Sequence, residues 1–366
     1  MFKFKQKKED LPQIKIEITP SIISIWDENN KLVLSEPAVI ATDTETKKIV
    51  AVGNDVDSAI SVRVYPKHVH VSEPFRIWLM QESKGENGEY LKNYLTNREE
   101  GEPISDEVLF AKSDLHNDIE TFIEQKEMNN IISAYLNKAF GKSKYYGVSA
   151  NVVLSAGFYD EGRERLREAF ISCGIEEVSF AERPVEVLDR ALDYYDTNEY
   201  NVVADIDEQL MDLVLLCGNE IVYRKSMPKG TKDIVADIQY HVRKEFLAVM
   251  SEGLAIKILN MIRSDDTSED EFINARMRDL VSGIPKDYKL PRGAIADVID
   301  SGVSKLYDFV KLFFDEMSKE GILTEEALTN IGEKGIIYAG PLYIHGIMRE
   351  RSSWIVRKTK NDTSET

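Results

Sequence analysis

The 366-residue sequence predicts an α/β protein of two domains. Short apolar strands separated by Pro, Gly and acidic turns occupy residues 14–53, and a second hairpin of the same kind begins at residue 201. Behind each group of strands, segments with apolar residues at helical spacing alternate with further short strands, which is typical of α/β domains. A chain of this length with 43% hydrophobic residues can form two cores.

The first predicted domain spans residues 14–200 and follows a basic and aromatic tail, 1–13. Its expected strands are 14–26 with one internal turn, 31–34, 38–42, 48–52, 148–154 and 177–181. Its expected helices are 115–123, 128–140, 160–173 and 184–195. Residues 69–80 fit a strand or a helix. Residues at about 81–103 are polar and rich in Gly and Glu, so they predict an exposed insertion.

The second predicted domain spans residues 201–351 and opens with a hairpin. Two apolar runs, 202–204 and 213–216, flank an acidic turn at 205–212, and the second strand is expected to continue to 226. The helices expected after it are 230–249, 252–262 and 292–317, with strands at 276–281, 287–290 and 335–339. A short linker is expected before the last strand. The polar residues 352–366 predict a disordered tail.

The overall charge and composition exclude several classes of protein. A net charge of −18 argues against nucleic-acid binding, which needs a basic face. With only Cys173 and Cys217 and no apolar run of about 18 residues, a cytoplasmic location is expected. Phe2 and Phe4, which alternate with lysines, are the candidate contact with an anionic membrane, and 78–80 is a second candidate.

Four segments of the chain resemble MreB, the rod-shape actin of bacteria. They are KLVLSEPAVIATDTETKKIVAVG (31–53), SANVVLSAGFYDEGRERLREAFISCGIEEVSFAERPVEVLDRAL (149–192), RMRDLVSGIPKDYKL (276–290) and GIIYAGPLYIHGI (335–347). The resemblance covers roughly residues 14–348 without the insertion. It implies the actin-like fold of the actin, Hsp70 and sugar-kinase superfamily, with two domains that each combine a β-meander and an α/β sheet and flank a central cleft.

The resemblance also implies a cytoskeletal role in cell shape. Proteins of this family form filaments that bind ATP and Mg²⁺ in the cleft and attach to the inner face of the cell membrane. The partners it implies are therefore further copies of this chain or another MreB-like filament. The family's closing C-terminal helix has no counterpart in the pattern of residues 352–366.

The two phosphate loops of the family are altered in this sequence. Where MreB has a turn of the Asp-Leu-Gly-Thr type, this chain has Glu17, Ile18, Thr19 and Pro20, so it has lost a flexible Gly and an N–H donor. The second loop reads Asp-Ile-Gly-Gly-Gly-Thr-Thr-Glu in the family. The matching residues here are Asp205, Ile206, Asp207, Glu208, Gln209, Leu210, Met211 and Asp212.

The catalytic and adenosine-side positions are altered as well. The family's catalytic acid directly precedes a Pro, but Pro184 follows Arg183, and the candidate acid Glu182 lies one place earlier. In a strand that step turns the side chain to the opposite face. The Gly-Gly-Gly turn on the adenosine side is replaced by Ala339-Gly340-Pro341. The sequence therefore predicts an MreB-like protein that has no bound cofactor, has lost or nearly lost ATP binding and hydrolysis, and works through contacts with filaments.

Three other interpretations stay open. The chain retains ATP and Mg²⁺ through its divergent loops, or it is an Mg²⁺-dependent phosphatase of the haloacid dehalogenase type with Asp205 as the nucleophile and Asp207 as the acid. The third is a hard-cation site at the acidic turn, formed by Asp205, Asp207, Glu208 and Asp212, with Asp205 as the candidate metal ligand that the family also has. His68 and His70 share a strand face without a third ligand.

Overall fold

The computed structural model describes residues 11–62, 69–82, 124–141, 145–158, 160–190, 199–227, 229–264 and 271–340. The chain divides into two compact units, Met1–Arg183 and Pro184–Thr366, which are described separately below. The domain limits predicted from the sequence stay predictions. Among the described residues, no helix combines the length and the apolar character needed to span a membrane.

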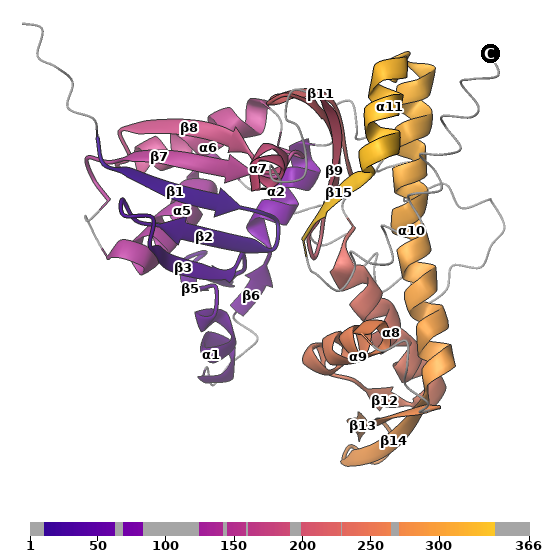
Figure 1. Cartoon of the computed structure of the whole chain (residues 1–366). Helices are drawn as coiled ribbons and strands as arrows, with labels where there is room; N and C mark the ends of the chain where they lie inside the picture. Colours follow the sequence, from indigo (N-terminus) through magenta and orange to yellow (C-terminus); the bar gives the residue numbers. More distant parts are fainter. Residues whose placement is uncertain are drawn as a thin grey trace, which may run out of the picture. The chain divides into compact units, whose positions relative to one another are not determined.

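The first unit is built on a five-stranded sheet with the order β3-β2-β1-β7-β8 (Figure 1). Its strands are β1 (Gln13–Ile18), β2 (Ile22–Trp26), β3 (Leu32–Pro37), β7 (Ser149–Leu154) and β8 (Glu177–Glu182). The first three strands form an antiparallel meander, while β7 and β8 run parallel to β1. Ile14, Ile16 and Ile18 alternate along β1 and are all buried, as a strand with an apolar face requires.

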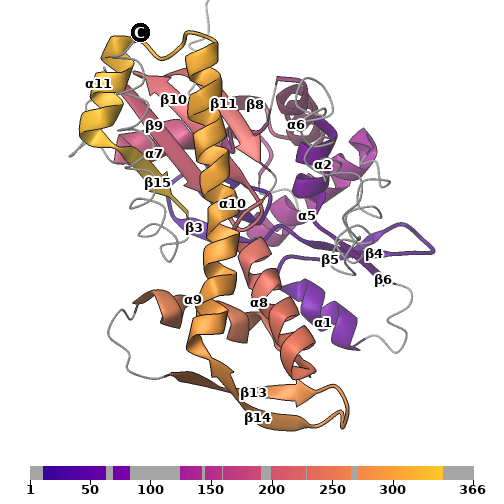
Figure 2. The ribbon, with the colours of Figure 1, turned by 90° about the vertical axis from the view of Figure 1, so that its right-hand side faces the viewer.

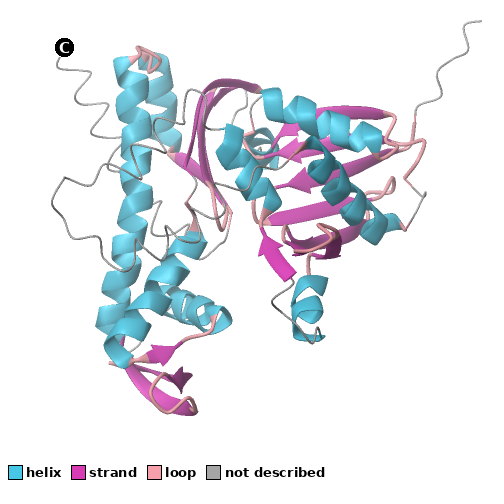
Figure 3. Ribbon diagram, turned by 180° about the vertical axis from the view of Figure 1, so that it is seen from behind, coloured by secondary structure: helices cyan, strands magenta, loops and turns pink. Residues whose placement is uncertain are grey.

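Helices and a small second sheet complete this unit. The helices are α1 (Asp55–Val62), α2 (Pro74–Glu82), α5 (Gln125–Phe140) and α6 (Asp160–Ser172). Helix α7 (Arg183–Arg190) begins at the last residue of this unit, and its other residues belong to the second unit. The small sheet has the order β5-β4-β6, with β4 (Ile40–Asp43), β5 (Ile49–Val52) and β6 (Val69–Ser72). Helices α5 and α6 cover one face of the large sheet, as seen from behind in Figure 3. Residues 69–80 contain both a strand and a helix.

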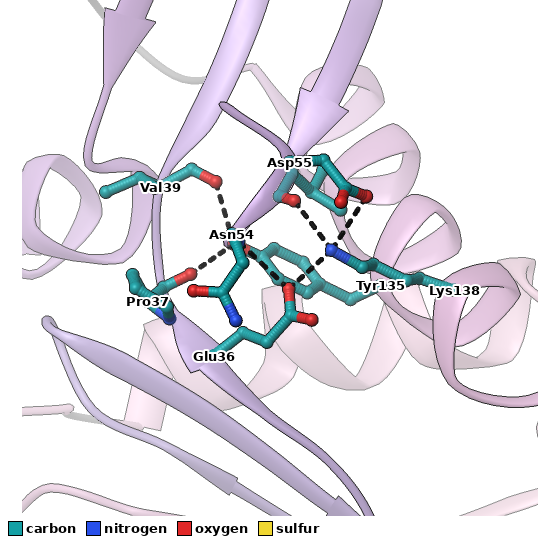
Figure 4. Close-up of polar contacts among 8 residues, drawn as sticks. Glu36, Pro37, Val39, Asn54, Asp55, Tyr135 and Lys138 are labelled. Carbon is teal, nitrogen blue, oxygen red and sulfur yellow. Dashed lines mark hydrogen bonds and ion pairs between the residues drawn. The ribbon is translucent and has the colours of Figure 1, made fainter. Parts of the chain in front are cut away.

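A polar cluster fastens α5 to the end of β3, to the segment that follows β3 and to the start of α1 (Figure 4). The Tyr135 hydroxyl lies 2.9 Å from the carbonyl oxygens of both Pro37 and Val39. Burial raises the pKa of Tyr135, so this hydroxyl keeps its proton and acts as a donor. The Lys138 ammonium lies 2.6 Å from Glu36 and 2.8 Å from Asp55. The cluster is a structural one, because its donors and acceptors bond to one another.

The second unit repeats the combination of meander and parallel strand. Its larger sheet has the order β11-β10-β9-β15, with β9 (Tyr200–Ile206), β10 (Met211–Cys217), β11 (Glu220–Met227) and β15 (Ile336–Ala339). Strands β9, β10 and β11 are antiparallel neighbours, and β15 runs parallel to β9. The helices are α8 (Thr231–Phe246), α9 (Glu252–Ser264), α10 (Arg292–Lys319) and α11 (Glu325–Lys334).

A three-stranded sheet, β12-β13-β14, forms a separate part of the second unit. Its strands are β12 (Ala248–Val249), β13 (Phe272–Asp279) and β14 (Pro285–Pro291). Within this unit, the β13–β14 hairpin and α11 lie at opposite ends of the long helix α10 (Figures 1 and 2). The buried face of α10 carries Ile295, Val303 and Phe313, so one apolar stripe extends along most of its length.

The structure corrects the sequence prediction at four elements. The helix expected at 230–249 ends at Phe246, and residues 248–249 form β12. The strand expected to continue from 213 to 226 is two strands, because Gly218 adopts a positive φ of 62° and reverses the chain. The linker expected before β15 contains α11, whose N-cap Thr324 accepts a hydrogen bond from the Ala327 amide. Helix α1 lies where no element was predicted.

Candidate functional site

The turn between β1 and β2 uses its own N–H donors. The Thr19 amide donates to the Ile22 carbonyl at 2.9 Å, and the Thr19 hydroxyl accepts from the amides of Ile22 at 3.0 Å and Ser21 at 3.3 Å. Pro20 has no N–H. Thr19 and Ser21 are also buried. Every amide from Thr19 to Ile22 is therefore committed to the turn itself, whereas a phosphate loop needs such amides to point at its ligand.

Two ion pairs engage the acidic residues at the same edge of this sheet. The Arg183 guanidinium lies 3.1 Å from the Glu17 carboxylate, and both side chains are only 18% exposed. Arg163 of α6 forms an ion pair with Glu182 and donates a 3.0 Å hydrogen bond to the Phe158 carbonyl. The acids that correspond to the first phosphate loop and to the candidate catalytic position are thus both held by arginines of the first unit.

The register of the sheet explains why these residues meet. Ile18 of β1 pairs with Leu154 of β7, which pairs with Glu182 of β8. The three strands are parallel and end together, so the β1–β2 turn and the start of α7 lie at one edge of the sheet. The structure therefore brings Glu17, Thr19 and Glu182 to the same edge, where open α/β sheets commonly place ligands.

In the second unit, the turn between β9 and β10 is shorter than the sequence indicated. Strand β9 continues to Ile206 and β10 begins at Met211, so the predicted turn residues Asp205 and Asp212 are instead paired strand residues. Both are buried, and Ser226 of β11 donates a hydrogen bond to the Asp212 carboxylate. The prediction of a turn at 205–212 was wrong at both ends, because residues 205, 206, 211 and 212 extend the two strands although two of them are acidic.

The turn itself consists of Asp207, Glu208, Gln209 and Leu210. The Asp207 amide donates to the Leu210 carbonyl at 2.8 Å. Asp207 is 7% exposed and Gln209 is 5% exposed, so most of this turn is covered by protein. The buried Asp207 and the half-buried Glu208 therefore occupy positions at which the family's second phosphate loop has glycines, and their carboxylates add negative charge where a phosphate would lie.

The N-terminus of α8 contacts this turn directly. The Thr231 amide donates to the Asp207 carbonyl at 3.2 Å, and the Lys232 amide donates to the Glu208 carbonyl at 2.8 Å. The amide of Gly230 donates to the Asp233 carboxylate at 2.9 Å. Free amides at a helix N-terminus form a common anion site. Here the first three amides already bond to the chain's own oxygens.

Two glycines allow the surrounding backbone to approach the hairpin. Gly340 has a φ of 106°, and a Cβ atom there would lie 1.7 Å from the Ile206 carbonyl oxygen. A Cβ atom on Gly230 would lie 2.2 Å from the Asp207 carbonyl oxygen. These glycines are explained by close contact between backbones, whether or not a ligand binds.

The predicted site residues therefore form one group in each unit. The group in the first unit contains Glu17, Thr19 and Glu182, and the group in the second contains Asp205, Asp207, Glu208, Gln209 and Gly340. Within the described part of the chain, no three His, Cys, Asp or Glu side chains are placed to hold a metal ion. The proposed role of Asp205 as a metal ligand stays a prediction.

The membrane and histidine predictions have mixed outcomes. Phe2, Phe4 and His68 lie outside the described residues, and His70 is exposed on β6. The interpretation of 78–80 as a membrane contact was wrong about Trp78, which is fully buried with the Arg165 guanidinium 4.6 Å from its ring centre. An aromatic side chain enclosed by the protein cannot contact lipid.

Sequence reasoning missed the residues that engage the altered loops. No role was predicted for Arg163, Ser226 or Lys232, because each bonds to a residue that is 14 or more positions away in the sequence. The one local signal was Arg183, which stands where the family has an acid. A cation at that position favours a nearby carboxylate partner, and the structure identifies it as Glu17.

Comparison with known proteins supports the actin-like fold. The family model described as MreB/Mbl protein matches residues 122–355. The cell shape-determining protein MreB of Pasteurella multocida (strain Pm70) is 24% identical over 192 residues, which are 52% of this chain and 53% of that protein. The chain thus spans about half the length of this curated relative.

Solved structures match almost the whole chain. MreB5 of Spiroplasma citri bound to AMPPNP has a TM-score of 0.66 at 16% identity and covers 98% of this chain and 97% of its own. A MamK double helical filament has a TM-score of 0.56 at 10% identity, with 95% and 91% covered. The fold and the match to the family model, which extends over more than half of the chain, lead to one conclusion: this chain belongs to the MreB/Mbl family of actin-like cytoskeletal proteins.

Proposed function

We propose that this protein is a filament subunit, or a partner of an MreB-like filament, that acts in cell shape without binding or hydrolysing ATP. The proposal rests on one observation: the N–H donors of the altered loops form hydrogen bonds with oxygen atoms of the chain itself. The amides from Thr19 to Ile22 and the first amides of α8 bond to protein oxygens, and an arginine pairs with Glu17. A protein with such loops acts through its contacts.

Electrostatics point in the same direction. A carboxylate about 4 Å from a phosphate charge costs on the order of 4 kcal/mol at an effective dielectric constant of 20. Asp207 and Glu208 add two carboxylates to the turn. Micromolar affinity for a nucleotide corresponds to roughly −8 kcal/mol. Two such penalties therefore offset most of the binding free energy of an ordinary nucleotide site.

A second candidate function is ATP-dependent assembly through divergent loops. It is favoured by two structures with the same fold, MreB5 of Spiroplasma citri bound to AMPPNP and to ADP. In that case Mg²⁺ would have to neutralise the added carboxylates, with Asp205 as its nearest family-equivalent residue. The phosphatase interpretation of Asp205 receives no support from the family or the fold.

Assembly of the purified full chain with and without ATP separates the two functions. Electron microscopy and sedimentation should show the same filaments, or the same co-assembly with a nucleotide-binding MreB filament, in buffer alone and with Mg-ATP. Filaments that form only with Mg-ATP would overturn the proposal and support the second function. The proposed location is the inner face of the cell membrane, where the tail with Phe2 and Phe4 is one candidate contact.

A further inference from the structure

The β9–β10 hairpin concentrates buried negative charge. Asp205 and Asp212 lie opposite each other in the register of the two strands, and they are 3% and 1% exposed. Asp207, in the turn, is 7% exposed. Carboxylates that lie opposite each other in a sheet repel, and buried carboxylates cost free energy unless positive charge or hydrogen-bond donors offset them. The hairpin therefore favours a positive group near its turn.

Two buried oxygen atoms at this turn indicate a ligand. Among the described residues, none forms a hydrogen bond with Oδ2 of Asp207 or with Oγ1 of Thr231. Thr231 is 1% exposed and is the first residue of α8. Its amide donates to the Asp207 carbonyl at 3.2 Å, so the two residues are in direct contact. Buried polar atoms of native proteins are almost always hydrogen-bonded, so a carboxylate oxygen and a hydroxyl of this kind point to a binding site.

The charge of the surrounding residues selects a cation as the ligand. Residues 205–212 and 229–233 contain five carboxylates but only two ammonium groups, those of Lys229 and Lys232. The amides at the start of α8, which would attract an anion, already bond to oxygen atoms of the chain. With these donors engaged and carboxylates in excess, an anion is repelled and a cation is attracted.

The oxygen atoms of the turn suit a primary ammonium better than a metal ion. In the part of the chain that the structure describes, no three acidic, His or Cys side chains are placed to hold a metal ion. A primary ammonium instead donates three hydrogen bonds to oxygen atoms of mixed type. Asp207 has a carboxylate, Thr231 has a hydroxyl, and Gln209, which is 5% exposed, has a side-chain carbonyl. Glu208 is half-buried, so the turn reaches solvent there, and its carboxylate suits a second positive charge on the same ligand.

We propose that the β9–β10 turn binds a linear polyamine, with one terminal ammonium at Asp207 and Thr231 and a second ammonium at Glu208. This inference rests on the proposed function, because it assigns a cation to the turn where the family binds phosphate. The altered loop is then a site whose ligand has changed sign. A polyamine bound there offsets the buried carboxylates, and it stabilises the folded chain because the unfolded chain lacks the site.

Isothermal titration calorimetry of the full chain with spermidine tests this proposal, in about 150 mM NaCl to screen exposed carboxylates. The unchanged chain should bind spermidine saturably. Asp207→Asn should weaken binding at least tenfold, because it removes a charge-assisted hydrogen bond. Thr231→Val keeps the shape of the side chain and should weaken binding about fivefold. Without spermidine, Thr231→Val should be at least as stable as the unchanged chain, since the hydroxyl bonds to no described residue.

Glu28→Gln is the matched control, because it removes an exposed carboxylate between β2 and β3 and should leave spermidine binding unchanged. The proposal is overturned if spermidine does not bind saturably, or if either variant at the turn binds it as tightly as the unchanged chain does. It is also overturned if Mg²⁺ alone binds with a dependence on Asp207 and spermidine does not, because the turn is then a metal site. A titration with Mg-ATP keeps the two proposals apart: tight binding of Mg-ATP contradicts the proposed function, whereas a chain that binds neither ligand contradicts only this inference.

Discussion

At the scale of single residues, the altered loops are explained by partners within the chain. The Thr19 hydroxyl accepts hydrogen bonds from two amides of its own turn, and Arg183 forms an ion pair with the carboxylate of Glu17. The sequence predicted the loss of donors at Pro20 correctly, because Pro has no N–H in any structure. The burial of Asp205 was not predictable in the same way, since strand residues beside it in space, not in sequence, create its surroundings.

Gly340 provides a prediction at this scale. Gly340→Ala should lower the free energy of unfolding by roughly 2–4 kcal/mol, because its Cβ would meet the Ile206 carbonyl at a φ of 106°. Gly293→Ala is the matched control: nothing lies within 4 Å of its Cβ position, so stability should change by less than about 1 kcal/mol. Urea denaturation without nucleotide measures both. Equal stability of the two variants would show that Gly340 is not kept for packing.

At the scale of elements, the order of strands and helices was largely predictable. The apolar alternation along β1 and the helical spacing in α5 and α10 each depend on one face that is buried, and this pattern is visible in a sequence. Helix α11 was missed because its 10 residues include few apolar ones, and only its cap Thr324 signals its start. The pairing of β11 with β10 was missed because the turn at Gly218 is only two residues long.

The β13–β14 hairpin provides a prediction about pH. The Lys286 ammonium and the Ser282 donors lower the pKa of Asp279 below its ordinary value of about 4. A lowered pKa means that this carboxylate stabilises the hairpin above pH 4, and that the contribution is lost as the pH falls from there toward the lower pKa. Asp279→Asn should therefore increase amide hydrogen exchange at residues 282–284 at pH 6.

The same comparison at pH 2.5 supplies the control for this prediction. This pH lies below the ordinary pKa of an Asp side chain, so the unfolded hairpin binds a proton at Asp279, part of the stabilisation is lost, and the two proteins should differ less than at pH 6. Exchange can be compared residue by residue between the two proteins at each pH. A difference that stays the same at both pH values would mean that the charge of Asp279 does not hold the turn.

At the scale of the whole molecule, the framework of an actin-like protein is combined with altered loops in both units. The fold needs only the strand and helix patterns, which are intact, whereas nucleotide binding needs particular glycines and donors. The two properties can therefore separate within one family. The sequence indicated both the actin-like fold and the altered loops, because the framework resembles MreB and the loops differ from it at identifiable positions.

Direct titration of the full chain with Mg-ATP tests the central claim of an empty nucleotide site. Isothermal titration calorimetry of the purified protein should give no saturable heat, which corresponds to a dissociation constant weaker than about 1 mM. A nucleotide-binding MreB protein titrated in the same buffer serves as the positive control. A dissociation constant tighter than about 10 μM for this chain would contradict the claim and restore ATP-dependent assembly as its function.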